Sequence, residues 1–247
     1  MTNPTHNRVA LQPAYILHTR PYRDSSCIAD VLTQDYGRMA LLVRGARGKR
    51  NAAFKGGLQP FTPLLISWIG KGELPMLTEL EAVGLPVVLS AARVIEGIYL
   101  NELLTRLLER GESMAGIYHN YHSALQGLAH EPATERILRL FEKELLQELG
   151  YGVILDVEGG GAPIQSELWY RYEIENGPRQ VAAPPTKDAI LGASLLSFAR
   201  RELADAQSLR DAKKLMRRLM APHLGLRPLH SRQLARALME LKKDLVV

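Results

Sequence analysis

Five short runs of β-branched, aromatic and aliphatic residues follow one another in the first 83 residues, and this repetition is the strongest constraint on the fold. The runs cover residues 14–18, 27–33, 38–44, 63–69 and 76–83, with turn signals between them. Runs of this kind predict β-strands. Because an open sheet would expose two edges, the pattern favours a small closed barrel. An OB-fold, which commonly binds single-stranded nucleic acid or oligosaccharide, is the leading candidate.

Helical periodicity replaces the strand pattern after Pro86. Apolar residues recur at helical spacing over residues 90–110, 113–129 and 132–149, which predicts a three-helix bundle with Ser90 as the first cap. Residues 152–187 interrupt the rhythm with three glycines and a predicted ribbon over 168–174 and 180–183. Helices are expected again over 188–203, 208–223 and 231–243, with Gly192 as a potential break in the first.

These patterns predict an α+β protein with two domains. A five-stranded OB-fold barrel would occupy residues 1–84, and a mainly α-helical domain would occupy residues 85–247. Within the second domain we expect the helical bundle at 88–150, a small β-ribbon insertion at 152–187 and basic helices at 188–247.

Positive charge is concentrated in two stretches of the chain. Residues 36–72 carry seven cations and no carboxylate, although the formal net charge of the whole chain is only +5. Residues 200–247 hold a second excess of +7, and residues 73–199 carry a net charge of −9. Cations that neutralise phosphates release condensed counterions, so such a cluster on a strand-rich segment indicates nucleic acid. The alternative for either stretch is an ordinary solvated basic surface.

The predicted DNA-binding residues are the cations of these two stretches, together with one arginine from the first predicted hairpin. They are Arg20, Arg38, Arg44, Arg47, Lys49, Arg50, Lys55 and Lys71, and, in the C-terminal helices, Lys213, Lys214, Arg217 and Arg218. Stacking of aromatic rings on bases would add to phosphate contact. We favour Tyr22 or Phe54 over Tyr36 for this role, and we expect Phe61 and Trp68 in the barrel core.

Motifs for catalysis, cofactors and metals are not found. The loop that begins at Gly45 has neither the glycine spacing nor the Ser or Thr of an ATPase phosphate-binding loop. His119 and His122 could share a helix face, but no third ligand stands nearby in the sequence. Cys27, the single cysteine, excludes an internal disulfide and is expected to be a small buried residue. We therefore expect no catalytic residue, no cofactor and no metal, and a cytoplasmic protein that lacks a signal peptide and a membrane span.

Several motifs resemble the bacterial RecO family of recombination mediators. The barrel segment contains Arg-Met-Ala-Leu-Leu-Val-Arg-Gly-Ala-Arg at residues 38–47 and Lys-Gly-Gly-Leu-Gln-Pro-Phe-Thr at residues 55–62. The helical part contains Tyr-Leu-Asn-Glu-Leu-Leu at 99–104, a Leu-Gly-Tyr-Gly ending at 149–152 and Lys213-Lys214. The similarity extends over nearly the whole chain.

The resemblance implies a function without covalent chemistry. RecO proteins combine an OB barrel with a helical domain, bind single- and double-stranded DNA and anneal complementary strands. With RecR they help to load RecA onto DNA coated by the single-strand-binding protein, SSB. The resemblance also implies that the helical domain binds the acidic C-terminal tail of SSB, with Arg139 as the carboxylate anchor and Phe141 beside it. The alternative is an ordinary ion pair of Arg139 with Glu135 or with a carboxylate next to Lys143. Many members carry a four-cysteine zinc site after Leu-Gly-Tyr-Gly, whereas residues 153–185 contain no cysteine here.

Two other classes of function fit parts of the pattern. An RNA-binding OB-fold protein would share the basic stretch but would not need helices that bind the SSB tail. A structural adaptor would use the acidic middle of the chain to bind a basic partner. Competition among single-stranded DNA, RNA and a peptide of the SSB tail distinguishes the three classes.

Overall fold

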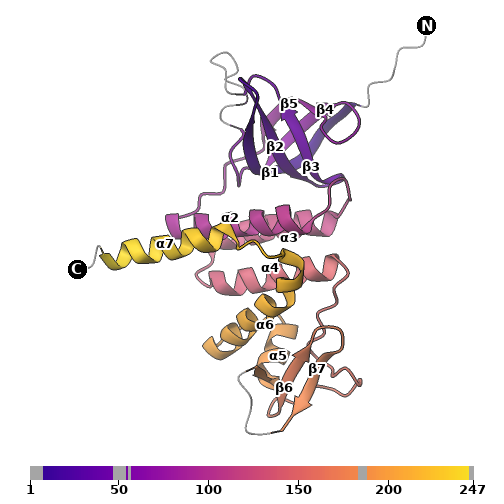
Figure 1. Cartoon of the computed structure of the whole chain (residues 1–247), viewed down its shortest axis with the longest axis vertical. Helices are drawn as coiled ribbons and strands as arrows, with labels where there is room; N and C mark the ends of the chain where they lie inside the picture. Colours follow the sequence, from indigo (N-terminus) through magenta and orange to yellow (C-terminus); the bar gives the residue numbers. More distant parts are fainter. Residues whose placement is uncertain (1–7, 47–53, 55–56, 183–187, 245–247) are drawn as a thin grey trace. The chain divides into compact units, whose positions relative to one another are not determined.

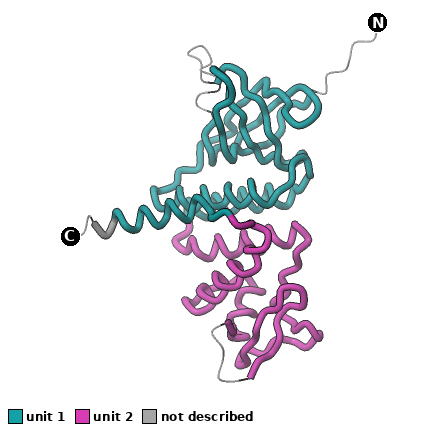
Figure 2. The backbone as a smooth tube through the Cα atoms, in the orientation of Figure 1, with its two compact units in different colours: residues 1–130, 227–247 teal, residues 131–226 magenta. Residues whose placement is uncertain are grey.

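The computed structural model describes residues 8–46, 54, 57–182 and 188–244, and side chains up to residue 241. The chain forms two compact units (Figure 2). The first contains residues 1–130 and 227–247, and the second contains residues 131–226. This division differs from the expected boundary at residues 84 and 85, because the first two helices and the last one group with the barrel.

The first unit begins with a closed five-stranded barrel in the strand order β1-β2-β3-β5-β4 (Figure 1). Its strands are β1 (Arg8–Tyr22), β2 (Ser26–Thr33), β3 (Gly37–Val43), β4 (Leu64–Ile69) and β5 (Met76–Ala82). All neighbouring strands are antiparallel except β3 and β5, which pair in parallel at Leu42 and Met76. The barrel is the predicted OB-fold, and all five predicted strands are present.

β1 is much longer than predicted because it bends and pairs with both β2 and β4. Its register shifts between Val9 and Gln12 and again between Ile16 and His18. Bulges of this kind let one strand turn a barrel corner. At the first bulge Leu11 has a φ of 52°, and its N–H donates to the Ser67 hydroxyl at 3.2 Å. The alternation of buried and exposed residues is lost at such irregularities, which explains why the predicted strand, residues 14–18, is shorter than β1.

The barrel core consists of small and branched apolar side chains around Trp68, which is only 2% exposed. Cys27 belongs to this core, as predicted. The outer face of β1 is also buried, because helices cover it. Tyr15 lies against Tyr118 and Tyr121 of a helix, with ring centroids 5.7 and 5.1 Å away. Both faces of β1 are buried over residues 14–17, which explains why this part of the strand is a continuous apolar run.

The helices of the first unit are α2 (Ala91–Leu107), α3 (Ala115–His130) and α7 (His230–Asp244). α2 packs against β1, α3 and α7. Asn101 of α2 joins these elements, since its amide donates to the Leu17 carbonyl of β1 and accepts from the Tyr121 hydroxyl of α3. Ser90 occupies the predicted cap position of α2, but its side chain makes no capping hydrogen bond.

The second unit combines helices with a three-stranded sheet in the order β7-β6-β8. Its helices are α4 (Thr134–Glu148), α5 (Gly192–Ala199) and α6 (Ala206–Leu224), and its strands are β6 (Trp169–Glu173), β7 (Gly177–Val181) and β8 (Ala189–Leu191). α6 packs on α4 and on α5. The helices expected to form one bundle at 88–150 are divided between the units: α2 and α3 group with the barrel, and α4 groups with α5 and α6.

The predicted helix at 188–203 is partly wrong, since its first residues form β8 on the edge of the ribbon. Gly192 stands at the change from strand to helix. A Cβ at this position would lie 1.9 Å from the Gln165 carbonyl oxygen, so only glycine fits. Two buried tyrosines attach the ribbon to the unit: the hydroxyls of Tyr170 and Tyr172 accept the backbone N–H groups of Gln165 and Ile154.

Candidate nucleic-acid interface

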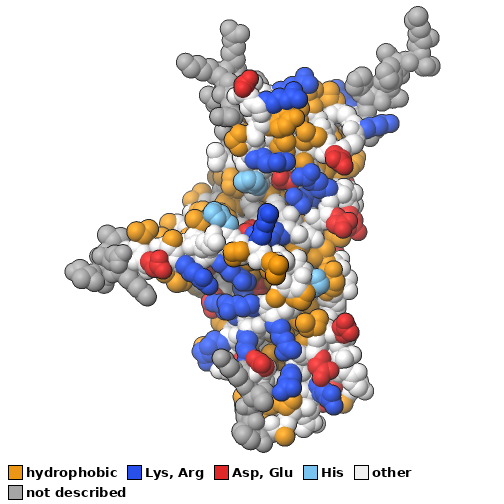
Figure 3. Space-filling view, in the orientation of Figure 1, with side chains coloured by type: hydrophobic (Ala, Val, Ile, Leu, Met, Phe, Trp, Pro, Cys, Tyr) orange, Lys and Arg blue, Asp and Glu red, His pale blue; other side chains and the backbone are white. Residues whose placement is uncertain are grey.

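Three of the predicted DNA-binding cations are exposed on the barrel. Arg20 lies near the end of β1, Arg44 directly follows β3, and Lys71 lies in the turn between β4 and β5. Blue side chains over the upper part of the first unit mark exposed cations in this region (Figure 3). Arg47, Lys49, Arg50 and Lys55 lie outside the described residues. The described part of the barrel thus presents cations from three separate segments to solvent.

Arg38 is not part of this exposed set, and the prediction for it needs correction. Its side chain is 15% exposed and forms an ion pair with Asp30 at 3.0 Å. It also donates to the Leu108 carbonyl at 3.0 Å. Arg110 binds the same carboxylate oxygen at 3.2 Å. The charge of Arg38 is therefore balanced inside the first unit, where it joins β3 to the end of α2.

The barrel aromatics divide into core and partly exposed residues. Trp68 belongs to the core cluster, as expected, and Phe61 is buried beside Gly97 of α2. Phe54 is partly buried and packs against the barrel core, so it presents less of its ring than a free stacking platform would. Tyr22 is partly buried, and the Arg23 guanidinium lies 5.2 Å from its ring centroid. A ring next to a cation is the combination that single-stranded nucleic acid binds.

α6 carries the second predicted cluster of cations. Asp205 starts the helix by accepting the N–H groups of Gln207 and Ser208. Apolar residues at helical spacing face inward, which leaves the basic positions on the outer side. Lys213 donates to Glu135 at 2.6 Å, and this hydrogen bond is the main cause that lowers the pKa of the Glu135 carboxyl. The remaining cations of the cluster are all exposed: Lys214, Arg217 and Arg218.

Arg139 and Phe141 lie in α4, and both are buried. Arg139 is 8% exposed and binds Glu142 at 2.8 Å, one helical turn further along. Glu142 precedes Lys143, so this pair is one form of the ordinary ion pair expected as the alternative, while Glu135 binds Lys213. Phe141 is 2% exposed, so it is part of the packing of α4 and offers no surface to a bound ring. The prediction for Phe141 as a contact residue therefore conflicts with its position.

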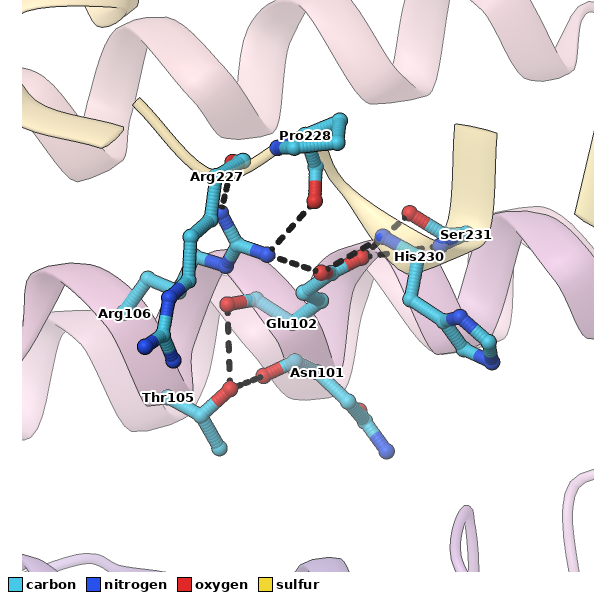
Figure 4. Close-up of polar contacts among 8 residues, drawn as sticks. All are labelled: Asn101, Glu102, Thr105, Arg106, Arg227, Pro228, His230 and Ser231. Atoms are coloured by element: carbon cyan, nitrogen blue, oxygen red, sulfur yellow. Dashed lines mark hydrogen bonds and ion pairs between the residues drawn. The ribbon is translucent and has the colours of Figure 1, made fainter. Parts of the chain in front are cut away.

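A polar cluster that the sequence did not indicate joins α2 to α7 (Figure 4). The Glu102 carboxylate accepts the backbone N–H groups of His230 and Ser231 at 2.8 and 2.9 Å, and the Ser231 hydroxyl at 2.7 Å. Arg106 binds the same carboxylate at 2.9 Å and donates to the carbonyls of Arg227 and Pro228. Burial acts to raise the pKa of Glu102, but the hydrogen bonds and Arg106 outweigh it and lower the pKa below its ordinary value.

Two further findings concern metals and membranes. Within the ranges that the structure describes, no three His, Cys, Asp or Glu side chains gather closely enough to hold a metal ion. His122 instead lies 2.6 Å from the Tyr15 hydroxyl through its Nδ1 atom. In the same ranges, every helix is too short or too polar to cross a bilayer.

Two protein-family models together match most of the chain. The model of the recombination protein O N-terminal domain matches residues 8–86, and that of its C-terminal domain matches residues 91–233. The protein named DNA repair protein RecO from Nitrosococcus oceani is 45% identical over 236 residues, covering 95% of this chain and 96% of the relative.

Two further relatives carry the same name, DNA repair protein RecO. The one from Alkalilimnicola ehrlichii is 42% identical over 235 residues, covering 94% of this chain and 93% of the relative. The one from Yersinia pestis is 43% identical over 229 residues, covering 91% and 93%. An OB-fold barrel and a helical region, each matched by its own family model, together with these relatives, show that the chain belongs to the RecO family of DNA repair proteins.

Proposed function

We propose that this chain is a recombination mediator that binds single- and double-stranded DNA and anneals complementary strands. The exposed cations on a closed OB barrel are the observation that carries the proposal. Arg20, Arg44 and Lys71 come from three segments of the barrel and reach solvent. They belong to a chain whose residues 36–72 contain no carboxylate.

Annealing needs a surface that reduces repulsion between two polyanions. Each cation that neutralises a phosphate releases a condensed counterion, which favours binding at low salt. Contacts to phosphates position a strand without occupying the base edges, so the bases stay available for pairing. The protein thus acts by binding, without a covalent step. Arg47, Lys49, Arg50 and Lys55 extend this surface in the proposal.

α6 supplies a second DNA contact in this proposal. Lys214, Arg217 and Arg218 are exposed on its outer side, whereas Lys213 is bound to Glu135. An ion pair on the surface contributes little and exchanges readily, so Lys213 can also turn towards a phosphate. A second basic surface in the same chain would let one molecule hold two strands.

Partners other than DNA follow from the family. We include RecR, with which the chain would help to load RecA, and the acidic tail of SSB. Arg139 is the proposed anchor for the terminal carboxylate of that tail, since guanidinium groups bind carboxylates through paired hydrogen bonds. Its present partner is Glu142, so the tail would have to compete with that carboxylate. Phe141 has no part in this proposal because it is buried.

A competition experiment tests the proposal. Labelled single-stranded DNA is bound to the full chain and displaced with unlabelled DNA, RNA of the same sequence or an acidic peptide that ends in phenylalanine. We expect DNA to displace the label, and the peptide to bind without displacing it. Preference for RNA would favour the RNA-binding class, and binding of the peptide alone would favour an adaptor.

Two variants then separate the two sites. We expect the double change Arg47→Ala and Lys49→Ala to weaken DNA binding and leave peptide binding intact. Arg139→Ala should do the opposite. Thermal unfolding of each variant serves as the control, because Arg139 is buried and its removal leaves Glu142 without that partner. Equal loss of both activities in both variants would contradict two separate sites.

A further inference from the structure

The second unit contains an open groove beside the basic surface of α6, and the groove shares Arg218 with that surface. Its volume is about 960 Å³, and it lies between the end of α4, the turn that joins β6 to β7 and the end of α6. Much of its lining is apolar, with Leu146, Val153, Ile154, Ile174, Leu219 and Pro222. A groove of this size with a few polar groups is a common form of ligand site.

Two stacked rings stand at this groove. The ring of Tyr151 lies 3.9 Å from that of His223 between centroids, at an angle of 35° between the ring planes. Tyr151 is 48% exposed, so the ring is stacked on one side and open to solvent elsewhere. One ring pair therefore presents aromatic surface to the groove.

The backbone holds Tyr151 in this position. α4 ends in a glycine cap: Gly150 has a φ of 83°, and its N–H donates to the Gln147 carbonyl. The N–H of Tyr151 donates to the Leu146 carbonyl at 2.9 Å. These two bonds form the Schellman motif, which fixes the direction of the chain just after a helix. Pro222, in the last turn of α6, precedes His223 on the opposite side.

The two walls of the groove carry opposite charge. Arg218 lies on the α6 wall, next to the exposed cations Lys214 and Arg217 of the same helix. Glu173, Glu175 and Asn176 lie on the wall formed by the β6–β7 turn; Glu173 is paired with Arg179 at 3.6 Å, so Glu175 supplies most of the negative charge of this wall. An anionic chain is therefore attracted to the α6 wall and repelled from the other one.

We propose that this groove binds one unpaired nucleotide of single-stranded DNA, with its base stacked on Tyr151 and its phosphate on Arg218. The inference rests on the proposed DNA-binding function and adds Tyr151 as a stacking residue for a base beside the phosphate contact of Arg218. A nucleotide fits both walls, because its charge lies on one side only and its base is neutral. The amino groups of the base can donate to the Glu173 or Glu175 carboxylates. An acidic peptide carries charge along its length and would meet repulsion at those same carboxylates.

Photocrosslinking of the full chain tests the position of the base. A single-stranded oligonucleotide with 5-iododeoxyuridine is irradiated in the complex, and the crosslinked peptides are identified by mass spectrometry. We expect a crosslink at Tyr151 or His223 in addition to any in the barrel. Crosslinks confined to the barrel would overturn the proposal while leaving DNA binding itself intact. The proposal would also be overturned if an acidic peptide shielded Tyr151 from chemical modification and the oligonucleotide did not.

Binding of matched oligonucleotides tests the stacking. One oligonucleotide carries all its bases, and the other is abasic at several positions but has the same phosphates. Tyr151→Ala should lower the affinity for the complete oligonucleotide by about tenfold, because loss of a stacked base has an effect of this size. The variant should therefore distinguish less between the complete and the abasic oligonucleotide. The salt dependence should not change, since tyrosine has no charge. Tyr151→Phe keeps the ring and should bind like the wild type.

The charge of Arg218 is tested separately. Arg218→Gln should reduce the slope of log affinity against log salt by about 0.7, the value for one phosphate contact on a single strand. Arg210→Gln is the matched control, because Arg210 lies on α6, binds Gln207 and does not line the groove. Unchanged affinity and base preference in Tyr151→Ala would overturn the groove assignment. Absence of DNA binding by the wild type would instead contradict the proposed function itself.

Discussion

The carboxylate of Glu102, on the fourth turn of α2, accepts the backbone N–H of Ser231 at 2.9 Å and so caps the first turn of α7. The first N–H groups of a helix have no partner within that helix, and α7 obtains its partner from another element. Arg106 holds both the carboxylate and the carbonyls that precede α7. This arrangement ties the last helix of the chain to the unit that begins with the barrel.

Loss of the Glu102 carboxylate should therefore loosen α7. We expect Glu102→Ala to lower the free energy of unfolding by about 1–2 kcal/mol, the usual cost of removing a helix cap. Hydrogen exchange at the amides of His230 and Ser231 should accelerate more than that of the barrel. Glu109→Ala, at an exposed position just after the same helix, is the control. Equal exchange rates at Ser231 in both variants would refute the capping role.

The same carboxylate predicts a pH dependence. The pKa of Glu102 in the folded chain is lower than its ordinary value of 4.5. A lowered folded pKa stabilises the protein at pH values above the unfolded pKa, and this contribution disappears as the pH falls through the folded pKa. The stability difference between wild type and Glu102→Gln should thus shrink when the pH is lowered from about 7 to about 3. A difference that is independent of pH would show that the carboxylate does not titrate in this manner.

Arg38 should matter for stability and not for DNA binding. Arg38→Met leaves the buried Asp30 with Arg110 as its ion-pair partner. The charge of Asp30 stays compensated, so the loss should be that of a hydrogen bond to a charged group, about 1.5–3 kcal/mol. Arg8→Met is the control, because its pair with Glu79 is exposed and should contribute less than about 1 kcal/mol. Chemical unfolding measures both values. If the folded Arg38→Met variant showed a weaker salt dependence of DNA binding than the wild type, Arg38 would contact DNA, contrary to this prediction.

The ribbon of the second unit should be stable without metal. Tyr172 is buried, and its hydroxyl accepts the N–H of Ile154 at 3.1 Å. Tyr172→Phe removes this acceptor and should cost about 1 kcal/mol. A zinc chelator should change the melting temperature of neither the variant nor the wild type. Tyr36→Phe, at an exposed ring, is the control. A fall in melting temperature with chelator would contradict attachment of the ribbon by packing and hydrogen bonds.

Local sequence patterns predicted the elements well where those elements depend on neighbouring residues. Four of the five barrel strands and five of the six helices outside the ribbon appear within a few residues of their predicted bounds, whereas β1 extends well beyond its predicted run. The exception, at residues 188–203, begins as a strand because Trp169 and Arg171 pair with Leu191 and Ala189. Such pairing depends on residues about twenty positions away, and helical periodicity contains no information about it.

The candidate site was less predictable, because the use of each charge depends on distant partners. Nothing around Arg38 in the sequence indicates that Asp30 and Arg110 will meet it. In the sequence, Glu102 resembles an ordinary helical surface residue, because its partner Ser231 in α7 lies more than a hundred residues further along the chain. Exposed cations such as Lys71 were easier to predict, because a glycine-rich turn usually lies at the surface.

The salt dependence of DNA binding by the full chain is the most direct measurement of the central claim. The affinity for a labelled single-stranded oligonucleotide is measured over a range of salt concentrations for three proteins with altered charge. One carries Arg44→Gln with Lys71→Gln, and the second carries Arg47→Gln with Lys49→Gln. The control carries Arg8→Gln, a change of an exposed cation that is not among the proposed DNA-binding residues.

If the barrel cations neutralise phosphates, each double change should reduce the slope by about one to two units, and the control should match the wild type. Slopes equal to that of the wild type in both double variants, with folding intact, would contradict the claim that these cations bind the DNA backbone.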